Sequence, residues 1–390
     1  MKRIAILVLI FCACFVSVAW TQQPAAKGSA NWTEFHRTNM VRWNPYETVI
    51  NVNNVGSLQL KWSYNAGGPV NDSPAVVNGA VYFGTDTVSD PHLYALNAST
   101  GAKLWSYPTG ILPLWSSPAV NNGVVYCGGG DPDIRGVPHN YVFALNASNG
   151  AKKWSYSTGI YAVIPSVAVA NGMVYFGSQA KKVYAVSAST GHLVWTHKVG
   201  YYVQSSPAVA SGVVYIGVLT GALDAFNATT GALLWSYGTG GLGYNSPAVV
   251  DGVVYIASPV NGVLYALNAG TGSLLWSYTT GGHFVETTPA VANGVVYLGG
   301  DDNVYALDAS TGGLLWSTYI GSVENVSPAV ANGVVYTGSD DGSVYALDAT
   351  TGVVLWSYDM GAQVLSSPAL VDGVLYIGDS NGYLYAFGLN

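Results

Sequence analysis

Short apolar runs alternate with polar turns rich in Gly, Asn and Asp along most of this chain. The stretch from Ser327 to Trp356 (SPAVANGVVYTGSDDGSVYALDATTGVVLW) shows the pattern, with successive apolar runs of which the last ends in Leu-Trp. Runs of this length that are rich in Val, Tyr, Leu and Ile and bounded by turn residues indicate β-strands rather than helices. The pattern therefore predicts a unit of four short strands.

The turns predict how these strands pair. The first run is followed by Asn-Gly or Asp-Gly in most copies, as in Asn332-Gly333 and Asp372-Gly373, and by Ser211-Gly212 in one. Such pairs accept the positive φ angles of a type I′ turn, which joins two antiparallel strands. The third turn carries an Asn or Asp whose side chain can bond the backbone two residues on, with Gly in the left-handed position. Each unit is therefore predicted to be an antiparallel meander.

The unit repeats with a period of about 40 residues, which is typical of propeller blades. Its opening Pro occurs eight times, from Pro74 to Pro368, with Pro165 taken as the third. Eight four-stranded meanders predict an all-β fold, an eight-bladed β-propeller with one blade per unit. The closing tryptophans are Trp62, Trp105, Trp154, Trp195, Trp235, Trp276, Trp316 and Trp356.

The order of these tryptophans predicts how the ring closes. The last unit stops at Asn390 without a Trp of its own, and Trp62 precedes the first unit. We therefore expect Ser57 to Tyr64 to supply the fourth strand of the last blade, beside Gly382 to Phe387. Closure leaves only short, protected strand edges. The propeller domain should span residues 57–390.

Residues 1–19 have the features of a signal peptide: two basic residues, an apolar stretch and the small-x-small site Ser17-Val18-Ala19. The apolar stretch is short for a membrane span, so we expect export to the periplasm or the exterior with no transmembrane segment. The residues before Cys14 fit a lipidation box poorly, so lipid anchoring is not expected. Residues 20–56 are interpreted as a lead-in segment, a structural strap packed on the ring.

Composition narrows the classes of partner. Only 8% of the residues are charged, against roughly 25% in an ordinary soluble domain. The formal charge is −7, which becomes −9 when the two basic residues of the signal peptide are removed, and no basic run occurs. These features argue against nucleic acid and against electrostatic attachment to a membrane. The one Cys outside the signal peptide, Cys127, occupies an apolar slot of the repeat and is expected to be buried.

The motifs SPAVxNGVVYxG and VYALDAxTGxxLW resemble the pyrroloquinoline-quinone-type (PQQ-like) propeller repeat, and the resemblance covers residues 31–390. It implies an eight-bladed propeller in which the repeated tryptophans dock neighbouring blades. Some members of this family are quinoprotein dehydrogenases, whereas others resemble the lipoprotein subunit of the outer-membrane barrel assembly machine, which binds partner proteins. The vicinal Cys pair of the dehydrogenases and a C-x-x-C-H haem motif are missing here.

A functional site is expected where the copies of the repeat differ. The loops between second and third strands are tight turns in most units but are expanded at Thr85 to His92 and at Gly128 to Asn140, which holds Asp131 and Arg135. Such loops on a rigid scaffold concentrate binding residues, although a solvated Gly-Pro loop fits the sequence equally well.

A second variable set lies a few residues before each opening Pro, at the expected mouth of the axial channel. It mixes aromatic, amide and acidic side chains, as small-molecule and glycan sites do, but a water-filled axis lined by solvated residues explains it as well. The set is Asn71, Trp115, Val163, Gln204, Tyr244, Glu286, Asn325 and Leu365.

These features favour an exported, monomeric, non-catalytic binding or scaffold propeller, which meets a protein, small molecule or glycan at its loop face. No catalytic residue is assigned, because no acid–base pair of fixed spacing occurs. The alternative implied by the resemblance is a dehydrogenase that uses pyrroloquinoline quinone and calcium, with Trp115 stacking on the quinone and Glu286 and Asn325 as calcium ligands. A third hypothesis is a glycan-binding module that uses the same aromatic residues.

Overall fold

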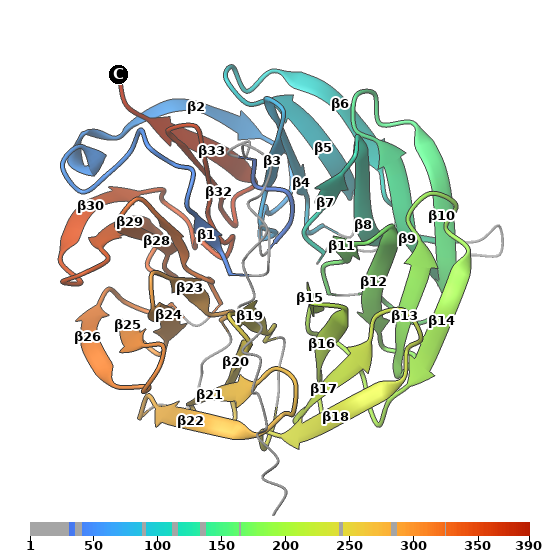
Figure 1. Ribbon diagram of the computed structural model, residues 1–390. Helices are drawn as coiled ribbons and strands as arrows, with labels where there is room; N and C mark the ends of the chain where they lie inside the picture. Colours follow the sequence, from blue (N-terminus) through green and yellow to red (C-terminus); the bar gives the residue numbers. More distant parts are fainter. Residues whose placement is uncertain are drawn as a thin grey trace, which may run out of the picture.

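The computed structural model describes residues 31–35, 41–87, 91–110, 116–132, 138–163, 165–241, 245–281, 287–323 and 325–390. Eight antiparallel sheets stand around one axis, one for each repeat (Figure 1). The prediction of an all-β, eight-bladed propeller is confirmed. Within the described part of the chain, no helix has the length and hydrophobicity of a membrane span.

In each blade the first strand lies nearest the axis and the fourth forms the outer rim (Figure 1). The strands of the first four blades are β3 (Ala75–Val77), β4 (Ala80–Gly84), β5 (His92–Asn97) and β6 (Lys103–Pro108); β7 (Ala119–Asn121), β8 (Val124–Pro132), β9 (Pro138–Asn146) and β10 (Lys152–Gly159); β11 (Ala168–Ala170), β12 (Met173–Ser178), β13 (Lys182–Ser187) and β14 (Leu193–Lys198); β15 (Ala208–Ala210), β16 (Val213–Val218), β17 (Ala222–Asn227) and β18 (Leu233–Gly238).

The other four blades repeat this arrangement, and the last takes its outer strand from the start of the chain. Their strands are β19 (Ala248–Val250), β20 (Val253–Ser258), β21 (Val263–Asn268) and β22 (Leu274–Thr279); β23 (Ala290–Ala292), β24 (Val295–Gly300), β25 (Asn303–Asp308) and β26 (Leu314–Tyr319); β27 (Ala329–Ala331), β28 (Val334–Gly338), β29 (Ser343–Asp348) and β30 (Val354–Asp359); β31 (Ala369–Val371), β32 (Val374–Gly378), β33 (Tyr383–Gly388) and β2 (Gln59–Asn65).

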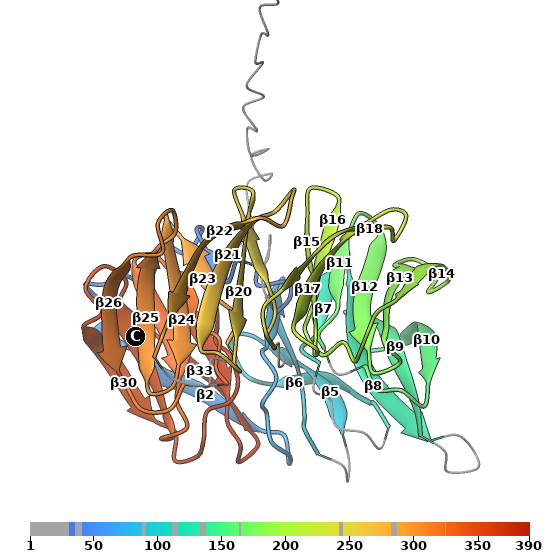
Figure 2. The same ribbon diagram turned by 90° about the horizontal axis from the view of Figure 1, so that it is seen from below.

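The strands run between two faces of the ring, which Figure 2 shows from the side. The turn face carries the two-residue turns and the third turns of the blades. Asn293 (φ 51°) and Gly294 (φ 77°) show the predicted type I′ geometry, and Asp308 Oδ1 accepts the backbone N–H groups of Ser310 (3.0 Å) and Thr311 (2.8 Å). The loop face, on the opposite side, carries the loops between second and third strands and those between blades.

Each repeated Trp except the last bonds to the next blade. Trp195 Nε1 donates to the carbonyl of Ala228 at 2.8 Å, and the hydroxyl of Tyr175, in the same blade as Trp195, donates to that carbonyl at 3.2 Å. The indole lies over Gly231, where a Cβ atom would come within 2.6 Å of the ring. The third turn of each blade, with its Gly, is therefore the socket for the Trp of the preceding blade.

The predicted closure is confirmed, with β2 paired to β33 and Trp62 opposite Ala386. The third and fourth strands of blade eight come from opposite ends of the chain, so that blade has no third turn to receive Trp356. The Trp356 ring instead packs edge-to-face on the Phe387 ring, with 5.3 Å between the ring centroids. A short 3-10 turn, η2 (Val55–Ser57), directly precedes β2, the outer strand of blade eight. The hydroxyl of Tyr336 at this seam is buried without a hydrogen-bond partner among the described residues.

The side chain of Cys127 is completely buried in an apolar cluster between blades one and two, as expected. Burial, with the nearby charge of Asp72 as a smaller contribution, raises the pKa of the Cys127 thiol to about 12. The thiol is therefore an apolar filler of the core rather than a nucleophile.

Candidate functional site

The lead-in segment enters the axial channel rather than packing on the outside of the ring. Asn31 bonds to Asn78 at the turn face, and Trp32 then forms a bridge with Val76 on the innermost strand of blade one. The return branch includes β1 (Trp43–Asn44), which adds to blade seven in parallel with β27. Residues 31–35 and 41–44 together form what we call the axial plug. The described part of the lead-in segment thus packs on the inner side of the ring, and the alternative of a water-filled axis is corrected.

The plug completes the hydrogen bonding of the innermost strands. The innermost strands present an unpaired edge to the axis, so their backbone N–H groups need acceptors there. At equivalent positions of several blades these N–H groups donate to the plug. The donors and acceptors are Val76 N to Trp32 O (2.7 Å), Val120 N to Thr33 O (2.6 Å), Val169 N to a Glu34 carboxylate oxygen (3.4 Å), Val291 N to Val41 O (2.9 Å) and Val330 N to Arg42 O (2.9 Å).

Arg42 holds the two branches of the plug together. Its side chain is completely buried and donates to the carbonyls of Pro328 (2.8 Å), Pro368 (2.9 Å) and Phe35. Its guanidinium group also stacks on the rings of Trp32 and Phe35. The planar fork of Arg suits several fixed carbonyl acceptors at once, which explains why a charged residue occupies the axis.

Glu34 is a second ionisable group of the plug. Burial raises the pKa of its carboxyl from 4.5 to about 8, and the hydrogen bond from the Val169 backbone opposes that shift. The carboxyl therefore changes charge in the physiological pH range.

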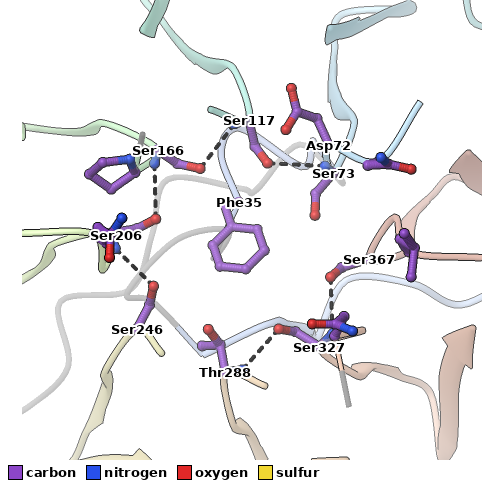
Figure 3. Close-up of a pocket in the computed structure, with 15 residues that line it drawn as sticks. Phe35, Asp72, Ser73, Ser117, Ser166, Ser206, Ser246, Thr288, Ser327 and Ser367 are labelled. Atoms are coloured by element: carbon purple, nitrogen blue, oxygen red, sulfur yellow. Dashed lines mark hydrogen bonds between the residues drawn. The ribbon is translucent and has the colours of Figure 1, made fainter. Parts of the chain in front are cut away.

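A ring of hydroxyl groups surrounds the tip of the plug. The backbone N–H of one hydroxyl-bearing residue donates to the hydroxyl oxygen of the next blade, and six bonds of this kind among the described residues link neighbouring blades (Figure 3). The ring consists of Ser73, Ser117, Ser166, Ser206, Ser246, Thr288, Ser327 and Ser367. Phe35 lies in the middle of this hydroxyl ring, with its aromatic face toward the viewer in Figure 3.

The plug tip and the hydroxyl ring enclose a polar cup of about 180 Å³. Phe35 forms its floor, the hydroxyl ring its wall, and Asn71, Gln204 and Asn325 are among the residues that line it further. The hydroxyl-bearing residues directly precede the innermost strands, which places the cup at the loop face.

Two acceptor atoms beside the cup have no hydrogen-bond partner among the residues that the structure describes. These are Asn71 Oδ1 and Asp72 Oδ2, both buried, and Asp72 itself is only 7% exposed. Burial, together with the charge of Asp86, raises the pKa of Asp72 well above its usual value. The cup therefore contains buried acceptors that a ligand with hydrogen-bond donors would satisfy.

The structure brings together some of the candidate residues at the channel mouth. Gln204, Asn325, Asn71 and Leu365 all line the cup, whereas Trp115, Tyr244 and Glu286 lie outside the described residues. Val163 is not equivalent to them. Ala168 in β11 corresponds to Ala119 in β7, so position 167 takes the place of Pro118, and Pro165 is not the opening Pro of its blade. Val163 is two residues before Pro165, whereas the other members of the set are three residues before their Pro, and the position equivalent by strand register, 164, lies outside the described residues.

The expanded segment of blade two is mostly strand rather than loop. β8 and β9 stay paired out to Pro132 and Pro138, with Asp131 opposite His139. The segment is therefore a hairpin longer than those of other blades, and the interpretation as a Gly-Pro loop is corrected for its described part. Arg135 lies outside the described residues.

Sequence reasoning missed the hydroxyl ring, Phe35 as its floor and Arg42. The ring had a visible signal, because a Ser or Thr stands before the opening Pro in nearly every unit. For the plug no such signal exists, because its contacts join residues up to 326 positions apart.

Together these features define an eight-bladed β-propeller with tryptophan-docked blades, an axial channel filled by its own N-terminal plug, and a small polar cup at the loop face. The chain belongs to the PQQ-like repeat family described as outer membrane protein assembly factor BamB, whose model matches residues 18–162, 138–283, 219–327 and 300–389.

Solved structures with the same fold include two dehydrogenases and a BamB protein. A europium-containing methanol dehydrogenase aligns with a TM-score of 0.76 at 16% identity, over 92% of this chain and 98% of that one. The quinohemoprotein alcohol dehydrogenase of Comamonas testosteroni gives 0.76 at 17% identity, over 92% and 80%. BamB of Moraxella catarrhalis gives 0.70 at 17% identity, over 85% and 100%. At these identities the similarity shows the fold alone.

Among curated proteins, a quinoprotein ethanol dehydrogenase of Pseudomonas putida is 35% identical over 98 residues. The match covers 23% of this chain and only 15% of that enzyme.

Proposed function

We propose that this protein is an exported, non-catalytic binding scaffold that acts through the loop face of its propeller. The observation that carries the proposal is the axial plug, which occupies the channel with this chain's own residues, and the cup that the described residues enclose at its tip has about 180 Å³. Sites for cofactor-sized ligands usually have roughly 300–1,000 Å³. A large internal site on the axis is therefore unfavourable, and the exposed loop face is left as the working surface.

The described residues of the cup do not fit pyrroloquinoline quinone with calcium. The quinone is a planar polyanion, whereas the residues that line the cup include the acid Asp72 and no Lys or Arg. Within the described ranges, no group of three His, Cys, Asp or Glu side chains is placed to hold a metal ion. Asn325, one of the calcium ligands considered, is exposed at the rim. These observations favour the scaffold over the dehydrogenase.

The long hairpin of blade two is the feature of the loop face best suited to a protein partner. The pairing of β8 and β9 extends from Val124 to Pro132, so the hairpin is rigid where most other blades have a tight turn. A preformed strand pair loses little conformational entropy on binding. We therefore place the main partner contact on this hairpin.

Site-specific photo-crosslinking in the native host tests this assignment. A photoreactive amino acid would replace His139 on the hairpin and, as a matched control, the exposed Thr229 on the turn face. We expect one discrete crosslinked partner from position 139 and none from position 229. A partner captured equally from both positions, or only from the turn face, would contradict the proposal.

A shortened hairpin provides the companion variant. Gly130 and Asn140 are directly opposite each other, so replacing residues 131–139 with Asn-Gly closes the strands with a two-residue turn. The variant should keep the melting temperature of the parent protein and lose the partner. Oxidation of an alcohol by the purified protein loaded with quinone and calcium would overturn the non-catalytic assignment directly.

A further inference from the structure

Charge is distributed unevenly around the ring. The chain has no Asp or Glu between Asp133 and Asp224, and this stretch holds six Lys or Arg residues. From residue 199 to the C-terminus the chain has thirteen Asp or Glu and no Lys or Arg. Blade three, formed by β11 to β14, lies entirely within the first stretch (Figure 1). It is therefore the basic part of an otherwise acidic propeller.

Three lysines of blade three gather at the loop face. Lys181 and Lys182 stand at the turn between β12 and β13, and Lys198 ends β14. Lys182 and Lys198 are directly opposite each other on neighbouring strands, a pairing of like charges that lowers stability. The backbone N–H of Val199 donates to the Lys181 carbonyl at 2.9 Å, which places Lys181 beside them. No carboxylate of the described residues forms an ion pair with any of the three.

Lys181 occupies a position that most later blades give to Gly. This residue directly precedes the third strand of its blade and has a φ of 59°. The equivalent residues of blades four, five, seven and eight, all with positive φ, are Gly221, Gly262, Gly342 and Gly382. A side chain is disfavoured in this left-handed region, whereas Gly adopts it readily. A Lys held in this conformation indicates a role other than stability.

Two aromatic rings hold the Lys181 side chain. Its ammonium group lies 4.9 Å from the centroid of the Tyr201 ring and 5.8 Å from that of the Tyr202 ring, and the centroids of the two rings are 4.6 Å apart. Tyr201 is itself exposed. A surface of positive charge and aromatic rings results, which we call the lysine patch. It consists of Lys181, Lys182, Lys198, Tyr201 and Tyr202.

An apolar margin borders the lysine patch on the side of blade two. Ile160 and Tyr161, in the loop between β10 and β11, are exposed. Their loop is joined to the turn of blade three, because the backbone N–H of Gln179 donates to the Ala162 carbonyl at 3.0 Å. The same loop directly follows β10, which pairs with the long hairpin as far as Asn140. The lysine patch is thus continuous, through this margin, with the hairpin on which we place the main partner contact.

We propose that the lysine patch binds an acidic segment of a partner protein, whose carboxylates contact the lysines and whose apolar side chains cover Ile160 and Tyr161. Charge complementarity selects this occupant, because the lysines have no acidic partner among the described residues and the later blades would repel an anion. Exposed aromatic rings beside the charges suit a polypeptide, which brings apolar side chains and carboxylates together. The inference rests on the proposed scaffold function and names the chemistry of its partner.

Peptide display on the immobilised mature chain tests this assignment. We expect peptides selected from a random library to be enriched in Asp and Glu, and the affinity of the best one to fall as the salt concentration rises. Fluorescence anisotropy measures that affinity. Lys181→Gln combined with Lys198→Gln should weaken the selected peptide about tenfold. The matched control is Lys152→Gln with Lys153→Gln, which removes the same charge at the turn face and should leave the affinity unchanged.

A single variant checks that weaker binding does not come from misfolding. Lys181→Gly introduces the residue that four other blades have at this position, so the variant should keep the fold and still bind the peptide less tightly than the parent. Selected peptides without an excess of acidic residues, or equal affinities of the two double variants, would overturn the assignment. Lysine-dependent binding to phosphatidylglycerol vesicles without peptide binding would also overturn it, as would lysine-dependent self-association in sedimentation velocity.

These outcomes are distinct from the crosslinking at position 139. A crosslinked partner that binds the Lys181→Gln, Lys198→Gln variant as tightly as the parent would leave the scaffold function intact and overturn the lysine patch. Lysine-dependent binding of acidic peptides by a protein that gives no crosslink at position 139 would support the lysine patch and contradict the hairpin contact.

Discussion

The Arg42 guanidinium lies 4.9 Å from the centroid of the Phe35 ring and donates to the Phe35 carbonyl, so one side chain joins the outward and return branches of the axial plug. The same group bonds to carbonyls of blades seven and eight. The plug therefore occupies the channel and also links blades seven and eight by hydrogen bonds, next to the point where the ring closes. We call this link the clamp.

Arg42→Met is expected to destabilise the protein by about 2–4 kcal/mol, because the carbonyls of Pro328, Pro368 and Phe35 lose their buried donor. Arg42→Lys should restore only part of this, because an ammonium cannot reproduce the planar fork. Urea unfolding followed by tryptophan fluorescence measures the effect. Lys103→Met, at an exposed site, is the control, and equal stability of Arg42→Met and the parent would contradict the clamp.

Stability should fall as the pH rises through the titration of Glu34. The pKa of its carboxyl is raised to about 8 in the folded state, above its ordinary 4.5, so the folded state favours the protonated form. This contribution is complete below pH 4.5 and is lost as the pH rises toward 8. Melting temperatures between pH 5 and pH 9 should decline in the parent, with a smaller decline in Glu34→Gln. Parallel curves for the two proteins would show that Glu34 is not the group responsible.

A Trp→Phe substitution should destabilise the protein more at Trp195 than at Trp356, which lies at the seam between blades seven and eight. Trp195→Phe removes an N–H that bonds the Ala228 carbonyl at 2.8 Å, whereas Trp356 has no third turn to bond to. Trp195→Phe and Trp356→Phe both replace the indole by a smaller ring, but Trp195→Phe should lower the free energy of unfolding by about 1 kcal/mol more. Chemical denaturation of the two variants side by side gives the difference, and equal losses would show that the indole hydrogen bond contributes little.

Pyrroloquinoline quinone and calcium, alone or together, should leave the melting temperature unchanged. A ligand at 100 times its Kd would add about 2.7 kcal/mol of stability, which is readily visible in a thermal melt. A quinoprotein dehydrogenase apoprotein run in parallel serves as the positive control. A shift that requires both additives would favour the dehydrogenase, and Trp115→Ala and Glu286→Ala would then be the variants to examine.

Local sequence was sufficient for the blades. Asn-Gly and Asp-Gly pairs between the first and second strands, with positive φ at both residues, form the first hairpin of most blades, as at Asn293-Gly294. The position of Trp62 before the first unit was enough to predict that β2 pairs with β33. The alignment failed only at Pro165, where one residue type was used in place of the strand register.

The candidate site was predictable only in outline. Two of the variable positions before each unit, Gln204 and Asn325, line the cup, because equivalent residues of a ring face the same axis. The longer hairpin of blade two was noticed as an insertion, but its continued pairing was not, since Gly128 to Gly130 have low strand propensity and pair with residues 140–142 only in the folded sheet.

The sequence by itself determined the repeat, the number of blades and the closure of the ring, because these depend on turn chemistry and on alternating patterns within a few residues. Only the tertiary structure decided that residues 31–44 enter the channel, that Phe35 meets the hydroxyl ring, and that Arg42 bonds to Pro328 and Pro368. Those contacts join positions far apart along the chain. They exist because eight unpaired inner edges converge on one axis and their polar groups need partners there.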